Sequence, residues 1–147
     1  MIEIYGWAQK KYKLEAQCAA QYALDFLHQP NVSLSIKFVG KREIRRLNRE
    51  FRQIDRVTDV LSFPSTDVVA GGTVADAEYV GDMALCLAKA KQQGKEYGGG
   101  TLAEIRKLVV HSVLHLFGYD HIKDEDYSVM NKKEQEIEKY ILKLENK

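Results

Sequence analysis

Residues 101–121 read TLAEIRKLVVHSVLHLFGYDH, and this stretch predicts the central element of the fold. Apolar residues lie on nearly every side of positions 108–117, which is typical of a helix buried in a core. Thr101 and Glu104 have the spacing of a capping box, so we expect the helix to begin there. Gly118 follows the last apolar residues, and glycine often ends a helix in a left-handed turn. The stretch therefore predicts one buried helix with a defined start and end.

Three of the four histidines of the chain lie in this helix or just after it. His111 and His115 are four residues apart, which places both imidazoles on one face of a helix. His121 follows the turn at Gly118, where a reversal of the chain can bring it to the same point. Buried imidazoles need partners, since an unsatisfied buried polar group costs about 1–3 kcal/mol, and a shared metal ion satisfies two at once. Three protein ligands with one open position suit zinc, so we expect one Zn²⁺ ion per chain.

The spacing of the three histidines and Gly118 is similar to that of the metzincin proteases. Those enzymes carry a glutamate directly after the first histidine, where it acts as the general base, and this chain has Ser112 there. A zinc site can support hydrolysis without that glutamate. A metallopeptidase-like zinc hydrolase is therefore an alternative reading, favoured by the spacing and opposed by Ser112.

The rest of the chain alternates between strand patterns and amphipathic helix patterns. Alternation with period two predicts strands, and apolar residues at helical spacing predict helices. Proline and glycine mark several ends, at Pro30, Pro64 and positions 98–100. The predicted strands are 2–5, 32–39, 58–63 and 79–87, and the further predicted helices are 14–28, 41–51, 88–97 and 124–144. The stretch through Gly71-Gly72 to Ala77 has loop composition and is a candidate flap.

The length of 147 residues suits one compact domain, so we expect a single domain over 1–147. Apolar residues make up 45% of the chain and charged residues 29%, as in soluble globular proteins. The sequence has neither an apolar run of membrane-spanning length nor a signal-peptide pattern, so we expect a cytoplasmic protein without a membrane partner. Cys18 and Cys86 are too few for a disulfide framework and are expected to be small buried side chains.

Positive charge is concentrated in residues 41–56, where seven basic and three acidic residues give a local net charge of +4 in a chain of net charge +1. Most charge runs are solvated helix faces. Here the concentration favours an anionic partner, because the planar fork of arginine donates two parallel hydrogen bonds to phosphate. A phosphodiester substrate would explain both the charge and the metal site. The candidate RNA-binding residues are Arg42, Arg45, Arg46, Arg49 and Arg56.

Several ordered motifs resemble the YbeY family of bacterial rRNA maturation endoribonucleases. Residues 111–121, HSVLHLFGYDH, are similar to the histidine signature of that family, and residues 58–64, TDVLSFP, are similar to its preceding strand motif. The resemblance covers residues 47–136. Its other elements are Asn48 and Arg52 ahead of the strand motif, the next strand at Val80-Gly81-Asp82, and Met130 with Glu134 in the C-terminal helix.

The resemblance implies an α/β (α+β) fold in which helices pack on a small mixed sheet of about four strands, with the histidine pair on a central buried helix. It also implies zinc held by His111, His115 and His121, and cleavage of single-stranded RNA in 16S rRNA 3′-end maturation and ribosome quality control. Arg52 matches the catalytic arginine of the family. The implied partners are single-stranded rRNA and the ribosome or its small subunit, and not DNA.

The chain departs from the family pattern at two places. Ser112 stands where glycine is common after the first histidine, and Gln53-Ile54 stands where Gly-Lys is usual after Arg52.

Acceptors near a metal-bound imidazole usually orient it through its other N–H, and Asp120 and Asp82 are candidates for that role. The sequence identifies no general base. A second alternative is a non-catalytic ribosome-associated protein with a structural zinc ion. Structural zinc normally has four protein ligands, so a fourth ligand such as Cys86 at bonding distance would favour this alternative.

Overall fold

A central sheet orders the strands β1-β2-β6-β3 in the computed structural model, which describes residues 1–65, 68–69, 73–74, 79–119 and 124–146. The strands are β1 (Ile2–Gly6), β2 (Ser33–Val39), β6 (Tyr79–Cys86) and β3 (Val60–Pro64). β1, β2 and β6 run parallel, and β3 pairs antiparallel with β6 at one edge. The predicted small mixed sheet is therefore confirmed.

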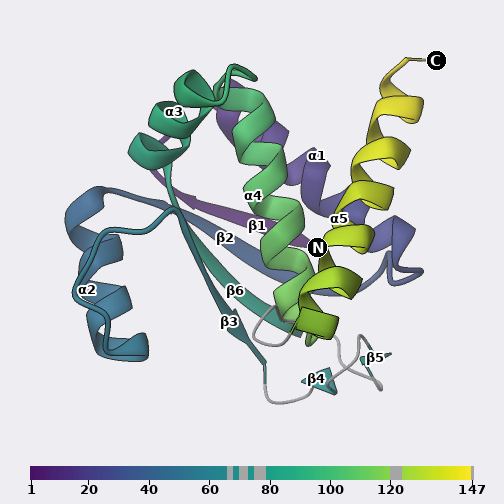
Figure 1. Cartoon of the computed structure of the whole chain (residues 1–147), viewed down its shortest axis with the longest axis horizontal. Coiled ribbons are helices and arrows are strands. Elements are labelled where there is room, and N and C mark those ends of the chain that lie inside the picture. Colours follow the sequence, from purple (N-terminus) through teal and green to yellow (C-terminus); the bar gives the residue numbers. More distant parts are fainter. Residues whose placement is uncertain (66–67, 70–72, 75–78, 120–123, 147) are drawn as a thin grey trace.

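Helices cover both faces of this sheet (Figure 1). On one face lie α1 (Lys10–Phe26), α4 (Thr101–Leu116) and α5 (Asp124–Glu145), which share a large apolar core with the strands. On the other face α2 (Lys41–Arg52) covers a smaller cluster built around Ile44. The short helix α3 (Leu87–Glu96) follows β6 directly and packs against α4. The mixed α/β fold class predicted from the sequence is confirmed.

The alternation of side chains along β3 and β6 assigns each residue to one of these faces. Val60 and Leu85 are paired and belong to the large core, whereas Leu61 and Ala84 are paired and belong to the cluster under α2. Because successive side chains of a strand point to opposite faces, Ser62 lies on the α4 face. Its hydroxyl oxygen lies 2.7 Å from that of Ser112 in α4.

The prediction of a buried helix at 101–117 is confirmed, because α4 buries residues on most of its circumference, among them Ile105, Val109 and Leu116. Gly118 has φ +91, in agreement with the predicted left-handed end.

The predicted capping box at the start of α4 is wrong. The N-cap residue is Gly100, with φ +89, and it offers no side-chain cap. Thr101 already lies inside the helix, and the Glu104 carboxylate accepts a hydrogen bond from Nε2 of Gln93 at 2.8 Å. A Cβ atom on Gly94 would lie 2.5 Å from the backbone of Gly100, so the close approach of α3 and α4 sets the start of the helix.

Two smaller expectations also need correction. Part of the stretch predicted as loop forms an antiparallel pair, β4 (Val68–Val69) with β5 (Thr73–Val74), and Gly71-Gly72 lies outside the described residues. Cys86 is buried as expected, but Cys18 is exposed, because it lies off the alanine stripe by which α1 meets the core.

Arg106 joins α5 to the rest of the core. Its Nη1 donates to Glu145 at 3.1 Å, and its Nε lies 3.6 Å from Glu138 and 3.9 Å from Glu15 of α1. Burial raises the pKa of both Glu15 and Glu138. These contacts hold α5 along α4 and so fix the position of the residues that α5 presents near the histidines.

None of the helices in the described parts of the chain combines the length and apolar character needed to cross a membrane.

Candidate functional site

A cavity of about 640 Å³ lies between the edge strand β3 and helix α4. Residues far apart in the sequence meet in its walls. It is lined by residues 58–62 and Pro64, by Glu104, Lys107, Leu108, His111 and His115 of α4, by Gln93 and Tyr97 at the end of α3, and by Arg52 and Glu134. The structure therefore brings two of the predicted zinc ligands and the predicted catalytic arginine to one cavity.

His111 and His115 face each other on α4, as their four-residue spacing predicts. Their Nε2 atoms lie 3.1 Å apart, and their rings meet edge to face with centroids 4.6 Å apart. Two nitrogen atoms bound to one tetrahedral zinc ion at about 2.0–2.1 Å lie about 3.3 Å from each other. The distance between the two Nε2 atoms is therefore compatible with a shared metal ion.

The third predicted ligand, His121, lies outside the described residues, as does Asp120. Within the described residues, no group of three histidine, cysteine or acidic side chains is arranged to hold a metal ion. Of the three predicted zinc ligands, the structure therefore gives the geometry of His111 and His115.

Glu134 of α5 orients His111. Its Oε1 accepts a hydrogen bond from Nδ1 of His111 at 2.6 Å, and both side chains are about a quarter to a third exposed. A proton held on Nδ1 leaves the lone pair on Nε2, the atom that faces His115. This is the usual arrangement by which a carboxylate fixes the tautomer of a metal-binding histidine.

The sequence pattern includes Glu134 in the family resemblance but does not assign it this role. The pattern instead suggests Asp120 and Asp82, and the structure shows that Asp82 is wrong for this role. The Asp82 carboxylate accepts hydrogen bonds from Ser35 and from Tyr79. Asp82 is paired with Phe63 and so lies on the sheet face opposite α4 and its histidines.

Arg52 is the last residue of α2 and lines the cavity, although α2 and α4 lie on opposite faces of the sheet. The helix ends after it because Gln53 adopts a left-handed conformation with φ +58. Asn48, which is buried, donates from Nδ2 to the backbone oxygen of Arg56 at 2.9 Å and so ties the following loop back to the helix. Among the described residues Arg52 makes no ion pair with a carboxylate, which leaves its guanidinium available to an anion in the cavity.

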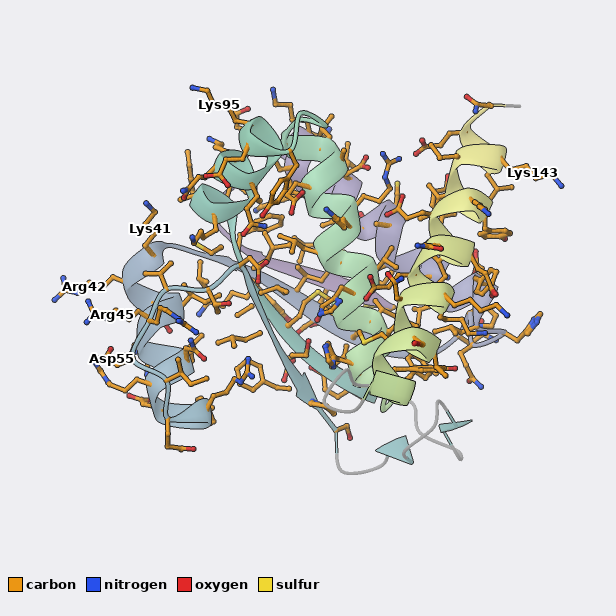
Figure 2. The ribbon with its side chains drawn as sticks, in the orientation of Figure 1. Lys41, Arg42, Arg45, Asp55, Lys95 and Lys143 are labelled. Carbon is orange, nitrogen blue, oxygen red and sulfur yellow. The ribbon has the colours of Figure 1, made fainter. Side chains whose placement is uncertain are left out.

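The other arginines of this segment are placed differently. Arg45 pairs with Asp55 at 2.8 Å, Arg49 lies 3.7 Å from Asp55, and Arg46 pairs with Glu43 and with Glu50. The hydrogen bond from Arg45 holds the pKa of the Asp55 carboxyl below its usual range. Figure 2 shows Arg42 and Arg45 projecting from the outer side of α2, away from α4. None of the predicted RNA-binding arginines, Arg42, Arg45, Arg46, Arg49 and Arg56, lines the cavity.

Neither Ser112 nor Cys86, on which the two alternative functions depend, lines the cavity. Ser112 is fully buried, and its hydroxyl is paired with that of Ser62, so it joins α4 to β3. Cys86 is fully buried in the cluster under α2, on the sheet face away from the histidines.

The fold and the cavity define a mixed α/β protein whose candidate metal site shares a cavity with an arginine. The family model described as "Endoribonuclease YbeY" matches residues 4–141 of this sequence. The chain therefore belongs to the YbeY family.

Curated relatives support this assignment. The chain is 46% identical to an Endoribonuclease YbeY of Clostridium acetobutylicum, over 71% of this chain and 72% of that protein. It is 44% identical to an Endoribonuclease YbeY of Finegoldia magna, over 80% and 74% of the two chains. The solution structure of TM1509 from Thermotoga maritima has a similar fold, with a TM-score of 0.67, 26% identity, and coverage of 96% of this chain and 89% of that one.

Proposed function

We propose that this chain is a zinc-dependent endoribonuclease that cleaves single-stranded RNA and acts in 16S rRNA 3′-end maturation and ribosome quality control. The proposal rests on the convergence of the histidine pair and Arg52 in one cavity, although they come from helices on opposite faces of the sheet. Membership of a family whose relatives are named endoribonucleases supports RNA as the substrate.

His111 and His115 would hold the zinc ion through Nε2, with His121 as the proposed third ligand. When bound, zinc supplies a Lewis acid that stabilises negative charge on a phosphodiester oxygen. Glu134 keeps the proton of His111 on Nδ1 and thereby keeps Nε2 available for the metal.

Arg52 would act on the phosphate from the other wall of the cavity. Cleavage of a phosphodiester passes through a transition state with extra negative charge on the phosphoryl oxygens. A guanidinium can donate two parallel hydrogen bonds to such a group, and one well-placed donor stabilises a transition state by about 2–4 kcal/mol. The tie between Asn48 and the loop after Arg52 holds the end of α2 in place for this role.

The size of the cavity favours a single strand. Its volume of about 640 Å³ lies within the usual range for small-molecule pockets, about 300–1,000 Å³. One or two nucleotides fill a space of this size, and their bases can contact its walls only when they are not paired and stacked in a duplex. RNA without secondary structure is therefore the expected substrate.

The direct test is cleavage of an unstructured, end-labelled RNA by the purified protein. We expect cuts within the chain when zinc is present, loss of cleavage after chelation and recovery when zinc is returned, with a duplex of the same sequence left intact. Depletion of the protein in its host should also lead to accumulation of 16S rRNA with an unprocessed 3′ end, measured by sequencing of RNA ends. Intact RNA in the presence of zinc would contradict the proposal.

The two rival functions predict other results in the same assay. A metallopeptidase would cleave unstructured peptides, which we do not expect, because Ser112 occupies the position of the protease base and is buried against Ser62. A non-catalytic zinc protein would bind zinc and leave both RNA and peptides intact.

A further inference from the structure

The cavity extends beyond the histidines, along α4 toward α3, and the residues there have no part in the proposed cleavage. Lys107 precedes His111 by one helical turn, which corresponds to about 6 Å along the helix axis. Glu104 lies about 10.5 Å from His111 by the same measure. Both line the cavity, together with Gln93 and Tyr97 of α3. The end of the cavity away from the histidines is therefore a separate region with its own chemistry.

Tyr97 offers an aromatic surface in this region. It follows the last residue of α3 and is 67% exposed, so much of its surface is open to a ligand. Lys107 holds its Nζ 5.1 Å from the centre of the Tyr97 ring. An aromatic ring on which a base can stack, beside a cation that can meet a phosphate, is the combination by which proteins hold single-stranded nucleic acid.

Polar groups with fixed orientation form the inner wall. Nε2 of Gln93 donates to Oε2 of Glu104 at 2.8 Å and to Oδ2 of Asp59 at 3.3 Å. Glu104 is only 5% exposed, and its other carboxylate oxygen lies 3.8 Å from Nζ of Lys107. Because both amide hydrogens of Gln93 are used by carboxylates, Gln93 can offer a ligand only its amide oxygen, which accepts hydrogen bonds. Acceptors of this kind suit the amino groups of cytosine, adenine and guanine.

We propose that Gln93, Tyr97, Glu104 and Lys107 form a binding subsite for the nucleotide next to the scissile phosphate, in which the base stacks on Tyr97 and Lys107 meets the adjoining phosphate. This inference rests on the proposed function, since it takes RNA as the substrate. The position one helical turn from the histidines corresponds to roughly one nucleotide step along an extended strand. The acceptor wall gives the subsite a preference for bases that carry an amino group.

The test compares zinc-loaded wild-type protein with Tyr97→Ala, Tyr97→Phe and Lys107→Ala. Cleavage of an unstructured cytidine-rich RNA gives KM and kcat, and fluorescence anisotropy with a labelled 2′-O-methyl cytidine decamer, chosen to resist cleavage, gives Kd. We expect Tyr97→Ala to raise KM and Kd about tenfold with a smaller change in kcat, because it removes the stacking surface. Tyr97→Phe should stay within about twofold of the wild type, since it keeps the ring.

Lys107→Ala should weaken binding and also lower the slope of log Kd against log salt concentration by about 0.7, the value for one phosphate contact on a single strand. Lys95→Ala is the matched control, because Lys95 also belongs to this helix pair but points away from the fold (Figure 2) and does not line the cavity. A uridine decamer should bind the wild type several-fold more weakly than the cytidine decamer.

The outcomes separate this proposal from the proposed function. If the wild type cleaves RNA but Tyr97→Ala and Lys107→Ala bind and cleave as the wild type does, the subsite is refuted and the nuclease function stands. If the wild type binds the decamer and the variants lose binding as expected, but no RNA is cleaved, these residues still form a nucleotide-binding site and the nuclease function is refuted. Equal affinity for cytidine and uridine decamers would contradict the proposal that acceptor oxygens in the subsite favour bases with an amino group.

Discussion

The two walls of the cavity are built in different ways. The α4 wall belongs to a helix that is buried on most of its circumference, and the residues directly before and after each of its two histidines are buried. The α2 wall belongs to a surface helix whose only buried residues are Ile44 and Asn48. His111 and His115, which need an exact mutual distance to share a metal ion, are thus placed by core packing. Arg52, which needs only to reach an anion, is placed by the end of α2 and by the buried amide of Asn48.

The largest effect should follow from a change in the α4 wall. His115→Ala removes one of the two Nε2 atoms that lie 3.1 Å apart, and a site that loses one of three ligands holds zinc weakly. The zinc content of the purified protein, measured by mass spectrometry of the metal, should fall from about one per chain to near zero. RNA cleavage should be lost with it. Unchanged zinc content would refute this assignment of ligands.

A change in the α2 wall should affect the reaction and spare the metal. Arg52→Ala should keep its zinc and its thermal stability and cleave single-stranded RNA about a hundredfold more slowly. Arg52→Lys should recover only part of the rate, since lysine keeps the charge without the bidentate fork.

Arg45→Ala is the matched control for Arg52, because Arg45 lies on the same helix, is paired with Asp55 and does not line the cavity. Its cleavage rate should stay within about twofold of the wild type, as expected for loss of an exposed ion pair. If Arg52→Ala cleaves RNA at the wild-type rate, Arg52 is not catalytic, and another residue or the metal alone must fill that role.

The hydrogen bond from His111 to Glu134 can be weakened without removing a proposed zinc ligand. Glu134→Gln keeps the size of the side chain but removes the charge that holds the proton on Nδ1 of His111. Zinc affinity, measured by competition with a chelator of known affinity, should fall about 10–100-fold. Glu136→Gln on the same helix is the control, because Glu136 pairs with Lys133 and is more exposed. If both variants bind zinc equally well, Glu134 does not orient His111.

The smallest effect concerns the end of α2. Gln53 occupies a left-handed conformation with φ +58, which glycine adopts without strain. Gln53→Gly should therefore raise the free energy of unfolding by about 0.5–1 kcal/mol, seen as a higher midpoint in urea denaturation. Gln53→Ala gains nothing by this reasoning and serves as the control. Equal stability of the glycine and alanine variants would show that strain at this position is negligible.

The sequence predicted the elements well where the signal is local. The spacing of His111 and His115, the apolar run of α4 and the turn at Gly118 each depend on a few neighbouring residues, and each agrees with the structure. The capping box failed although it is also local. The close packing of Gly94 against Gly100 decides the start of that helix, and a pattern within one helix carries no information on that contact.

The errors in the site arose where the answer depends on long-range geometry. Glu134 lies 23 positions from His111 in the sequence, and only the docking of α5 on α4 brings them together. The prediction for Asp82 was wrong because β6 is covered on both faces. Its side chains do not alternate between buried and exposed, so the sequence does not reveal which of them point toward α4. Arg52 lines the cavity, whereas Arg45, Arg46 and Arg49 lie beside carboxylates of their own segment, and the sequence does not reveal this difference.

The sheet itself has a consequence for self-association. Its two edge strands, β1 and β3, are five residues each, and β3 ends at Pro64, which has no backbone N–H to donate. Short edge strands and proline are common means by which soluble proteins discourage pairing between the sheets of different molecules. Another copy of the chain would gain few backbone hydrogen bonds at either edge. The open side of β3 can therefore border a cavity without making the protein prone to aggregate there.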